Sequence, residues 1–304
     1  MKRVVSVSIG SSKRNHVVEV KILGETVRIE RIGTDGDVKL AIDMIKRLDG
    51  HVDAFGLGGI DLYVRAGKHR YLLREAASIA RAAKVTPVVD GGGLKDTLER
   101  RVVKYLVEED VLPLKGRRVL LVSGADRFGM AEALMAQGAD LVLGDLIFVL
   151  GLPIPMRSLQ TLETLARLVA PLVVQLPSSM IYPTGKKQEG ERRVPEKFAH
   201  FYRQAEIIAG DFHYVKRYMP ENMHGKVILT NTVTSDDVAD LKRRGVRMLV
   251  TTTPEFQGRS FGTNVMEAVL VALSDKPYSG ELTAEDYIGL LEKLEFKPRV
   301  ETLN

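Results

Sequence analysis

Two glycines and an aspartate at a characteristic spacing form the most informative motif of the chain. Gly124 and Gly129 lie in the turn after the apolar run 119–122, and Asp145 follows a second apolar run, 21 positions after Gly124. In dinucleotide-binding domains such a turn opens a helix that faces the pyrophosphate, and an acidic residue after the next strand binds a ribose hydroxyl. The spacing therefore predicts a cofactor site made by Ser123, Gly124, Gly129 and Asp145.

The turn departs from the usual G-x-G-x-x-G pattern at its middle position. Asp126 stands where the second glycine would let a pyrophosphate approach, and its carboxylate would repel that group. Three interpretations stay open: dinucleotide binding, binding of S-adenosylmethionine or a mononucleotide with Asp145 still on the ribose, and an ordinary turn whose glycines only permit tight turning. A free carboxylate at Asp145 favours NAD over NADP, because it would repel a 2′-phosphate.

Polar residues follow most of the predicted strands in the second half of the chain. Ligands of open parallel sheets bind at the carboxyl ends of the strands, so these residues are candidates. They are Ser123, Asp145, Ser178, Ser179, Asp211, Thr230, Asn231, Thr232, Thr251, Thr252 and Thr253. This rim predicts hydrogen bonds to a ribose, phosphate or polyol, and Thr230, Asn231, Thr251 and Thr252 are predicted to contact the cofactor. The alternative is that these hydroxyls cap the following helices.

A glycine-rich strand end in the first half of the chain predicts a substrate site. Asp90, Gly91 and Gly92 follow a short apolar run, and glycines there would let the backbone approach a ligand. Lys95 and Asp96 would open the next helix, where a lysine beside a carboxylate can act as an acid–base pair. Tight turning alone is the alternative.

Two further features could take part in catalysis or substrate binding. His213 titrates near neutral pH and is a third candidate for proton transfer, although a lone histidine is more often a surface or capping residue. Arg259 and Ser260 lie in a glycine loop before a predicted helix, which is typical of an anion cradle for a substrate; the alternative is a mobile glycine loop. The histidines lack metal-ligand spacing and the chain has no cysteine, so we predict no metal site.

Apolar runs and turn residues predict the elements that would position these groups. In the first half we expect strands at 4–9, 16–23, 26–32, 52–57 and 85–89, with a hairpin at Gly24, and helices at 37–48, 73–84 and 94–107. In the second half we expect strands at 118–122, 141–143, 171–175, 206–209, 226–230 and 247–251, separated by helices near 127–137, 158–169, 195–204, 235–244 and 263–273. A last helix near 283–293 could pack back on the first domain.

This alternation predicts an α/β protein of two domains. Residues 1–112 form an N-terminal α/β domain with an early β-hairpin, and residues 113–304 form a Rossmann-like nucleotide-binding domain with a doubly wound, mostly parallel sheet. The boundary lies near Pro113, in a segment typical of a linker.

The composition of the chain limits the kinds of partner that it is expected to bind. The chain has 304 residues, 45% of them hydrophobic, and no apolar run long enough to cross a membrane. The net charge of +5 suits small anionic ligands, but no basic helix or tail indicates nucleic-acid binding. The absence of cysteine and of a signal peptide pattern predicts a cytoplasmic protein. We expect its partner to be a small-molecule substrate. Whether the chain forms a homo-oligomer stays open.

The segment Ser8–Lys13 offers a different interpretation. A turn after the first of three early strands resembles the nucleotide-binding architecture of sugar kinases and actin, although those proteins begin this loop with an aspartate where this chain has Ser8. A phosphotransferase would bind magnesium–ATP here.

Five segments carry a family resemblance over nearly the whole chain: GSSKRNH at 10–16, GLGGIDLY at 56–63, VVDGGGLKDTLERR at 88–101, GADRFGMAEAL at 124–134 and TTTPEFQGRSFGTNVMEA at 251–268. The chain resembles bacterial proteins that are identified as quinate/shikimate 5-dehydrogenases. The resemblance implies oxidation of a hydroxyl on a cyclic polyol acid by a nicotinamide cofactor, with the substrate between two domains. The S-x-S-P and N-V-T-x-P-x-K motifs of shikimate dehydrogenases are absent, and by position Lys95 and Asp96 would take their lysine and aspartate roles.

The leading prediction is therefore an NAD(P)-dependent oxidoreductase that acts on a small hydroxylated acid such as quinate or shikimate. Lys95, Asp96 or His213 would move the proton. A non-catalytic protein that binds a nucleotide or metabolite in the same cleft, and a phosphotransferase, are the alternatives.

Overall fold

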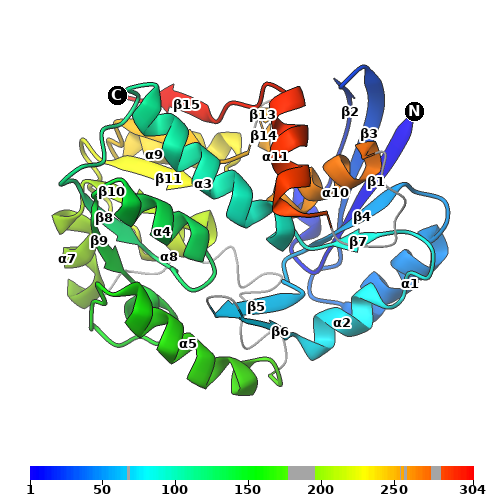
Figure 1. The fold of residues 1–304 in the computed structure, drawn as a ribbon, viewed down its shortest axis with the longest axis horizontal. Coiled ribbons are helices and arrows are strands. Elements are labelled where there is room, and N and C mark those ends of the chain that lie inside the picture. The colour runs from blue at the N-terminus through cyan, green and yellow to red at the C-terminus, as the bar shows by residue number, and fades with distance from the viewer. Residues whose placement is uncertain (67–68, 177–195, 254, 257–258, 275–281) are drawn as a thin grey trace.

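Two mostly parallel sheets dominate the computed structural model, which describes residues 1–66, 69–176, 196–253, 255–256, 259–274 and 282–304 (Figure 1). Helices cover both sheets, so the predicted α/β class is confirmed. No helix in these ranges is long and apolar enough to span a membrane.

The first sheet has the strand order β2-β3-β1-β4-β7. Its strands are β1 (Lys2–Ser8), β2 (His16–Ile22), β3 (Glu25–Gly33), β4 (Ala54–Gly58) and β7 (Val88–Val89). Only β2 runs antiparallel to its neighbour, and the predicted hairpin joins it to β3 through Leu23 and Gly24, which both have positive φ. The side chains of β1 alternate, with Val4 in one core and Val5 and Val7 in the other, because the sheet is covered on both faces.

The helices on the first sheet come from both ends of the chain. One face packs against α1 (Val38–Leu48) and α2 (Arg74–Ala80). The other packs against α10 (Thr263–Leu273), α11 (Ala284–Lys293) and the first half of α3 (Gly92–Glu108). Figure 1 shows α10 and α11, in orange and red, beside the blue strands. The last helix therefore does pack back on the first sheet, through Tyr287 and Leu291.

The second sheet has the strand order β15-β12-β11-β10-β8-β9. Its strands are β8 (Arg118–Leu121), β9 (Asp140–Leu143), β10 (Ile207–Ala209), β11 (Val227–Thr230), β12 (Met248–Thr251) and β15 (Arg299–Thr302). All are parallel except β15, which closes one edge. The chain leaves β8 for β9 on one side and then crosses to β10 on the other, so the strand order reverses between β8 and β10. Such a switch point is where open α/β sheets bind ligands.

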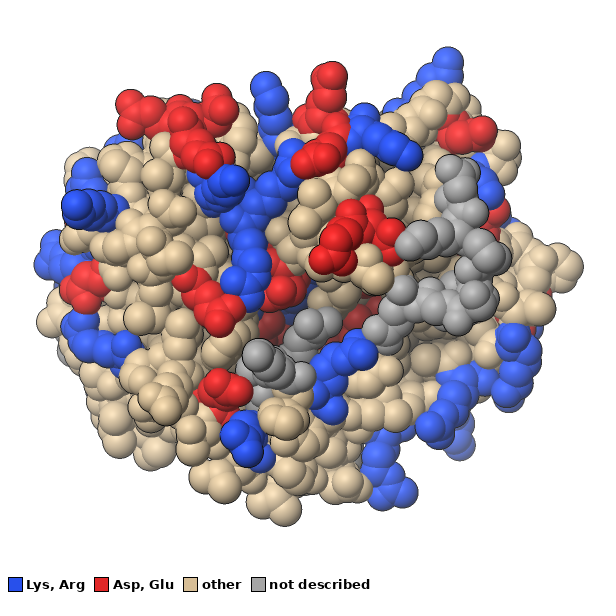
Figure 2. Space-filling view, in the orientation of Figure 1, with Lys and Arg blue, Asp and Glu red and all other residues tan. Residues whose placement is uncertain are grey.

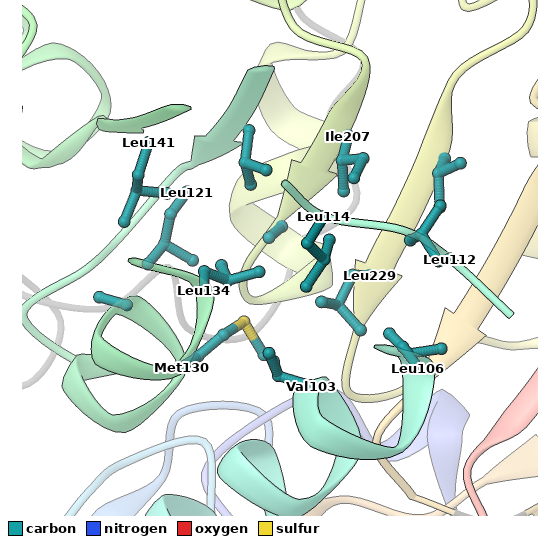
Figure 3. Packing of buried hydrophobic residues seen from close by; sticks show 14 of the residues in the cluster. Val103, Leu106, Leu112, Leu114, Leu121, Met130, Leu134, Leu141, Ile207 and Leu229 are labelled. Atoms are coloured by element: carbon teal, nitrogen blue, oxygen red, sulfur yellow. The ribbon is translucent and has the colours of Figure 1, made fainter. Parts of the chain in front are cut away.

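The second sheet is doubly wound. On one face α3, α4 (Phe128–Ala136) and α5 (Leu159–Val173) pack against alternate strand residues, including Leu121, Ile207 and Leu229 (Figure 3). On the other face α7 (Glu196–Gln204), α8 (Phe212–Tyr218) and α9 (Ser235–Arg243) cover the strand residues whose side chains point the opposite way. Because α3 contributes to the cores of both sheets, it ties them together. The predicted boundary near Pro113 lies in the connection from α3 to β8.

The strand predicted at 171–175 is wrong, because these residues end helix α5. The β-branched pair Val173 and Val174 suggested a strand, but the helical spacing of apolar residues continues from Leu162 to Ala170. Val174 is buried in the core of the first sheet, and its carbonyl accepts a hydrogen bond from the backbone N–H of Arg74 at 3.4 Å. The sixth strand of the second sheet is instead β15.

Four short elements were not predicted. They are the hairpin of β5 (Tyr63–Ala66) and β6 (His69–Leu72), the hairpin of β13 (Glu255–Phe256) and β14 (Arg259–Ser260), the 3-10 turn η1 (Ser12–Arg14) and the π-helix η2 (Asp145–Val149). The first hairpin packs against α5, so it bridges the open side between the two sheets.

Candidate functional site

The carboxyl ends of the two sheets face a common cleft. β1 and β4 of the first sheet deliver Ser8 and Gly58 to it, and the loops after β8, β10 and β11 of the second sheet deliver Asp126, Asp211 and Asn231. In both sheets the strand order reverses at these strands, between β1 and β4 and between β8 and β10. The cleft has a narrow part of about 220 Å³ and a wide part of about 700 Å³, which share Asp61, Asp90, Lys95, Asp126 and Arg127.

Charged side chains line the wide part of the cleft (Figure 2). Carboxylates outnumber cations there. The carboxylates are Asp53, Asp61, Asp90, Asp96, Glu99, Asp126, Glu132, Glu163 and Glu267, and the cations are Lys2, Arg70, Lys95, Arg100 and Arg127. The narrow part has as many arginine and lysine side chains as carboxylates, and it contains His213.

Lys95 and Asp126 form an ion pair across the middle of the cleft. Lys95 lies in the first turn of α3 and Asp126 in the turn after β8, and Nζ donates to Oδ1 at 2.6 Å. Lys95 is largely buried, with a side-chain exposure of 14%, whereas Asp126 is 39% exposed. The residue at the atypical position of the glycine turn therefore has a cationic partner and faces the cleft.

Arg127 lies beneath this pair and is fully buried. Its guanidinium binds Glu99 of α3, which is equally buried, and its Nη2 lies 3.4 Å from Oδ2 of Asp211. The same carboxylate oxygen accepts a hydrogen bond from Nδ2 of Asn231 at 2.9 Å. A continuous hydrogen-bond network thus links Glu99 of α3 to the residues that follow β10 and β11. This network holds the carboxylate of Asp211 in place in the cleft.

Arg14 and His213 meet across the narrow part. Nη1 of Arg14, in η1 of the first half, lies 2.9 Å from Nε2 of His213, in α8 of the second half. Because arginine can only donate, Nε2 of His213 is the acceptor, and the ring proton is therefore on Nδ1. Burial lowers the pKa of His213, and the charge of Arg14 lowers it further, against the opposing effect of Asp211. His213 is thus held as a neutral imidazole.

Two carboxylates of the cleft have pKa values shifted in opposite directions. Burial raises the pKa of Asp126 and the charge of Asp61 adds to this, although Lys95 lowers it. Burial would also raise the pKa of Asp211, but at the acid pH where Asp211 titrates the charges of protonated His213 and of Arg127, with the hydrogen bond from Asn231, lower it to about 2. Asp211 is therefore ionised at neutral pH, whereas Asp126 holds a proton more readily than an ordinary aspartate. Such opposed pairs are typical of acid–base sites.

The predicted cofactor turn is occupied by its own aspartate. Oδ2 of Asp145 accepts the backbone N–H of Gly124 and Oδ1 accepts that of Ala125, both at 2.9 Å. The side chains of Leu143 and Leu162 close the space around Gly124, since a Cβ there would lie 2.8 and 3.0 Å from them. The two N–H groups that would bind a pyrophosphate already have an anion. With Asp145 in this position, the turn does not fit a dinucleotide.

The other predicted cofactor contacts lie below the surface of the second sheet. Ser123, Thr230, Thr251 and Thr252 are all buried, and none of them lines either part of the cleft. The hydroxyl of Thr230 donates to the carbonyl of Gly210 at 2.7 Å, and that of Thr251 to the carbonyl of Thr253 at 2.8 Å. Of the predicted rim, Asn231, Thr232 and Asp211 line the narrow part of the cleft.

The glycines after β7 accommodate a helix rather than a ligand. The N-terminus of α10 lies against them, and a Cβ on Gly91, which has φ +94°, would be 2.5 Å from the backbone nitrogen of Asn264. Asp90 accepts hydrogen bonds from the backbone N–H groups of Leu62 at 2.5 Å and Gly92 at 2.8 Å. Asp90 and Gly92 still line the cleft, where they were predicted to contact substrate.

The predicted pair of Lys95 and Asp96 does not form. Neighbouring residues of a helix point in different directions, so Asp96 binds Arg100, one turn along α3, and Lys95 binds Asp126. Asp96 also lies against Gly129, whose missing side chain lets α4 approach α3. The backbone of Arg259 and Ser260 forms β14, but their side chains, like residues 178 and 179, lie outside the described part of the chain.

The loop of the phosphotransferase alternative is held by internal hydrogen bonds. Oδ1 of Asp35 accepts the N–H of Ser12 at 2.8 Å, and Oγ of Ser8 accepts that of Gly10 at 3.1 Å. Arg31 donates to Oγ of Ser8 and to the carbonyl of Ser11, both at 3.1 Å. Within the described residues, no three His, Asp or Glu side chains cluster in a way that would hold a metal ion.

Several cleft residues were not assigned a role from the sequence: Arg14, Arg31, Asp61, Asp126 and Arg127. The signal for most of them was available. Asp61 comes soon after β4, and Asp126 and Arg127 soon after β8, so the rule that selected Asn231 would have selected them as well, whereas Arg31 lies within β3 and Arg14 in η1. Glu99 gave no such signal, because it lies in the middle of a helix.

Two protein-family models match this chain. The chain belongs to the family described as "Domain of unknown function (DUF8754)", whose model matches residues 93–303. A second model, "Domain of unknown function (DUF8753)", matches residues 3–90. No curated protein matches the chain.

Solved structures with a weak likeness include dehydrogenases and sugar-binding proteins. A Mycobacterium smegmatis protein in complex with β-D-fucofuranose is 10% identical, with 99% of each chain covered and a TM-score of 0.35. Glutamate dehydrogenase from Thermus thermophilus is 12% identical over 97% of this chain and 70% of its own, with a TM-score of 0.39. NAD-dependent malic enzyme from Thermotoga maritima is 11% identical over 97% and 84%, with a TM-score of 0.32. These scores are too low to carry over anything that those proteins bind or do.

Proposed function

We propose that the cleft binds a small hydroxylated acid and that Asp126, with Lys95, exchanges a proton with one of its hydroxyls. The observation that carries this proposal is the Lys95–Asp126 pair at 2.6 Å, which lies where the carboxyl ends of both sheets meet. Both parts of the cleft include this pair, so a ligand in either part can reach it.

The charge distribution supports this class of ligand. Arg14 and Arg31 lie in the narrow part, where a carboxylate of the ligand would be attracted to two guanidinium groups. Asp211 and Asn231 supply oxygen acceptors for hydroxyl groups near by. The volume of about 220 Å³ is below that of a typical drug-sized site, which suits a small metabolite such as a cyclic polyol acid.

Asp126 is the group best suited to move a proton. Its raised pKa brings it nearer to neutral pH, where a general acid or base works best, and Lys95 stabilises the ionised form after the transfer. Asp211 stays ionised, so it orients the ligand rather than exchanging protons. His213 offers a second proton carrier only if the ligand displaces Arg14 from Nε2.

Calorimetric titration with shikimate and quinate, and with myo-inositol as the uncharged polyol, tests the ligand class. We expect the acids to bind and the inositol to bind at least about tenfold more weakly. Arg14→Gln should remove this preference, whereas Arg28→Gln, a matched change on an exposed ion pair of the first sheet, should keep it. Equal affinity for acid and polyol, or no binding of any of them, would disprove the proposal.

Turnover separates an enzyme from a binding protein. If the bound acid is converted, Asp126→Asn should lower kcat by a factor of about 10² or more, and Asp140→Asn, on the surface at the start of β9, should leave it unchanged. A ligand that binds tightly and is recovered unaltered would instead assign the cleft to a non-catalytic binding protein.

The second candidate is the NAD(P)-dependent oxidoreductase. The reversal of strand order between β8 and β10 favours it, because dinucleotides bind at such switch points. Asp145 on the N–H groups of Gly124 and Ala125 opposes it. Titration with NAD and NADP in the presence of shikimate decides between the two. A protein that binds shikimate but neither nucleotide would exclude the oxidoreductase and leave the cleft proposal in place.

A further inference from the structure

Basic side chains gather around a second hollow, at the opposite edge of the second sheet. Its volume is about 550 Å³, and it lies at the amino ends of β8, β10, β11 and β12. We call it the basic hollow and define it by its charged residues, which are Arg117, Arg118, Arg203, Glu206, Lys226 and Arg247. Five cations thus surround one carboxylate.

The sheet itself brings these cations together. Arg118 begins β8, and Lys226 and Arg247 immediately precede β11 and β12. Parallel neighbouring strands begin at the same edge, so basic residues at their starts converge although they are far apart in the sequence. The chain has a formal net charge of +5, and the hollow alone holds four more cations than carboxylates. The basic hollow therefore carries an excess of positive charge, whereas the wide part of the cleft carries an excess of carboxylates.

For four of these cations, Arg117, Arg118, Lys226 and Arg247, the contacts within the described residues do not neutralise the charge. Glu206 is shared between Arg117, at 2.7 Å, and Arg118, at 3.6 Å, so one carboxylate serves two cations. Nζ of Lys226 donates to the carbonyls of Ala205 and Arg203, at 2.6 and 3.1 Å, which leaves the third of its three donors. No hydrogen bond or ion pair within the described residues holds the guanidinium of Arg247, which is exposed.

From this arrangement we infer that the basic hollow binds a small ligand with a di- or triphosphate group. Guanidinium groups bind phosphate oxygens in pairs, and several phosphates in one ligand match an excess of several positive charges. The volume is within the range of small-molecule sites. Single-stranded nucleic acid is a poorer match, because the described residues that line the hollow include no Phe, Tyr or Trp on which bases could stack.

Titration calorimetry with inorganic tripolyphosphate tests this inference on the full chain. We expect binding that Arg247→Ala and Lys226→Met each weaken by at least about tenfold. Arg243→Ala is the matched control, because Arg243 is an exposed arginine of α9 paired with Asp240 and Glu221 outside the hollow. That variant should bind within about twofold of the wild type, since surface ion pairs contribute little.

Three results would overturn the inference. The first is no measurable binding of tripolyphosphate to the wild type. The second is an equal loss of affinity in Arg243→Ala and Arg247→Ala, which would indicate a diffuse effect of net charge. The third is tighter binding of a short single-stranded oligonucleotide than of tripolyphosphate. Melting temperatures of the variants show whether each is folded, and Asp126→Asn, in the cleft, should bind tripolyphosphate as the wild type does.

Discussion

Replacement of Asp145 by alanine removes the two acceptors that hold the turn after β8. Its oxygens accept the N–H groups of Gly124 and Ala125 at 2.9 Å, and the carboxylate is buried, with a residue exposure of 8%. A buried N–H without a partner costs about 1–3 kcal/mol, so two would cost roughly 2–6 kcal/mol. Burial raises the pKa of Asp145, which means that the buried charge itself opposes folding. Asp145→Ala also removes the unfavourable burial of this charge, which offsets part of the cost, so we expect a net loss of about 2–4 kcal/mol in the free energy of unfolding.

Urea denaturation at neutral pH measures this loss. Asp140→Ala is the control, because Asp140 also lies on β9 but pairs with Arg157 on the surface and should contribute less than about 1 kcal/mol. A nucleotide titration on the same samples adds a second measurement. If Asp145→Ala abolished binding of NAD while it changed the free energy of unfolding by less than about 1 kcal/mol, Asp145 would serve a ribose and the structural explanation would be refuted.

Three further predictions concern stability. Asp211 has a pKa of about 2 in the folded protein, below the ordinary value of the unfolded chain, so its ionised form contributes about 2 kcal/mol to the free energy of unfolding. This contribution is present above the unfolded pKa and is lost as the pH falls toward 2. Asp211→Asn should therefore flatten this part of the curve of stability against pH. Gly91→Ala should lower the free energy of unfolding by about 3 kcal/mol or more, because the residue has a positive φ and the new Cβ would collide with the backbone of α10. The control is Gly116→Ala, where φ is +72° but the space is open, so the loss should be only about 1 kcal/mol. Equal losses in the two variants would contradict the collision. Glu99→Gln removes the carboxylate that pairs with the buried guanidinium of Arg127, so it should lower the free energy of unfolding by about 3–5 kcal/mol. Denaturant titration measures this loss, and an unchanged stability would refute the pairing.

The order of strands and helices followed largely from local patterns. Apolar runs such as 119–122 lie between two helical layers, so they read as buried strands, and their ends were predicted within about two residues except at β7, which was predicted from 85 and begins at Val88. The segment 171–175 failed because its valines favour a strand locally, whereas the buried contact of Val174 with the first core is a tertiary effect. The edge strand β15 was missed because its alternating charges resemble a solvated tail.

The candidate site was less predictable, because its contacts join distant segments. Lys95 and Asp126 are 31 positions apart, and Arg14 and His213 are 199 positions apart. The strand-end rule located Asn231, Lys95 and His213 near one cleft without giving their partners. It could not reveal that the carboxylate of Asp145 turns back onto the preceding loop, since a ribose and two backbone N–H groups are equally good partners for a carboxylate at that spacing.

The return of α10 to the first sheet has a consequence for how the chain is made. Val265, Val269 and Leu270 complete the core of strands that begin at Lys2, so a ribosome must synthesise most of the protein before that core can close. Gly56 and Gly58 of β4 and Gly91 after β7 lie against the start of α10, whose Asn264 donates to Ser6 at 2.9 Å. A fragment that ends at residue 90 would therefore display an uncovered apolar face and depend on chaperones or aggregate, whereas the same fragment supplied together with residues 91–304 could recover a folded pair.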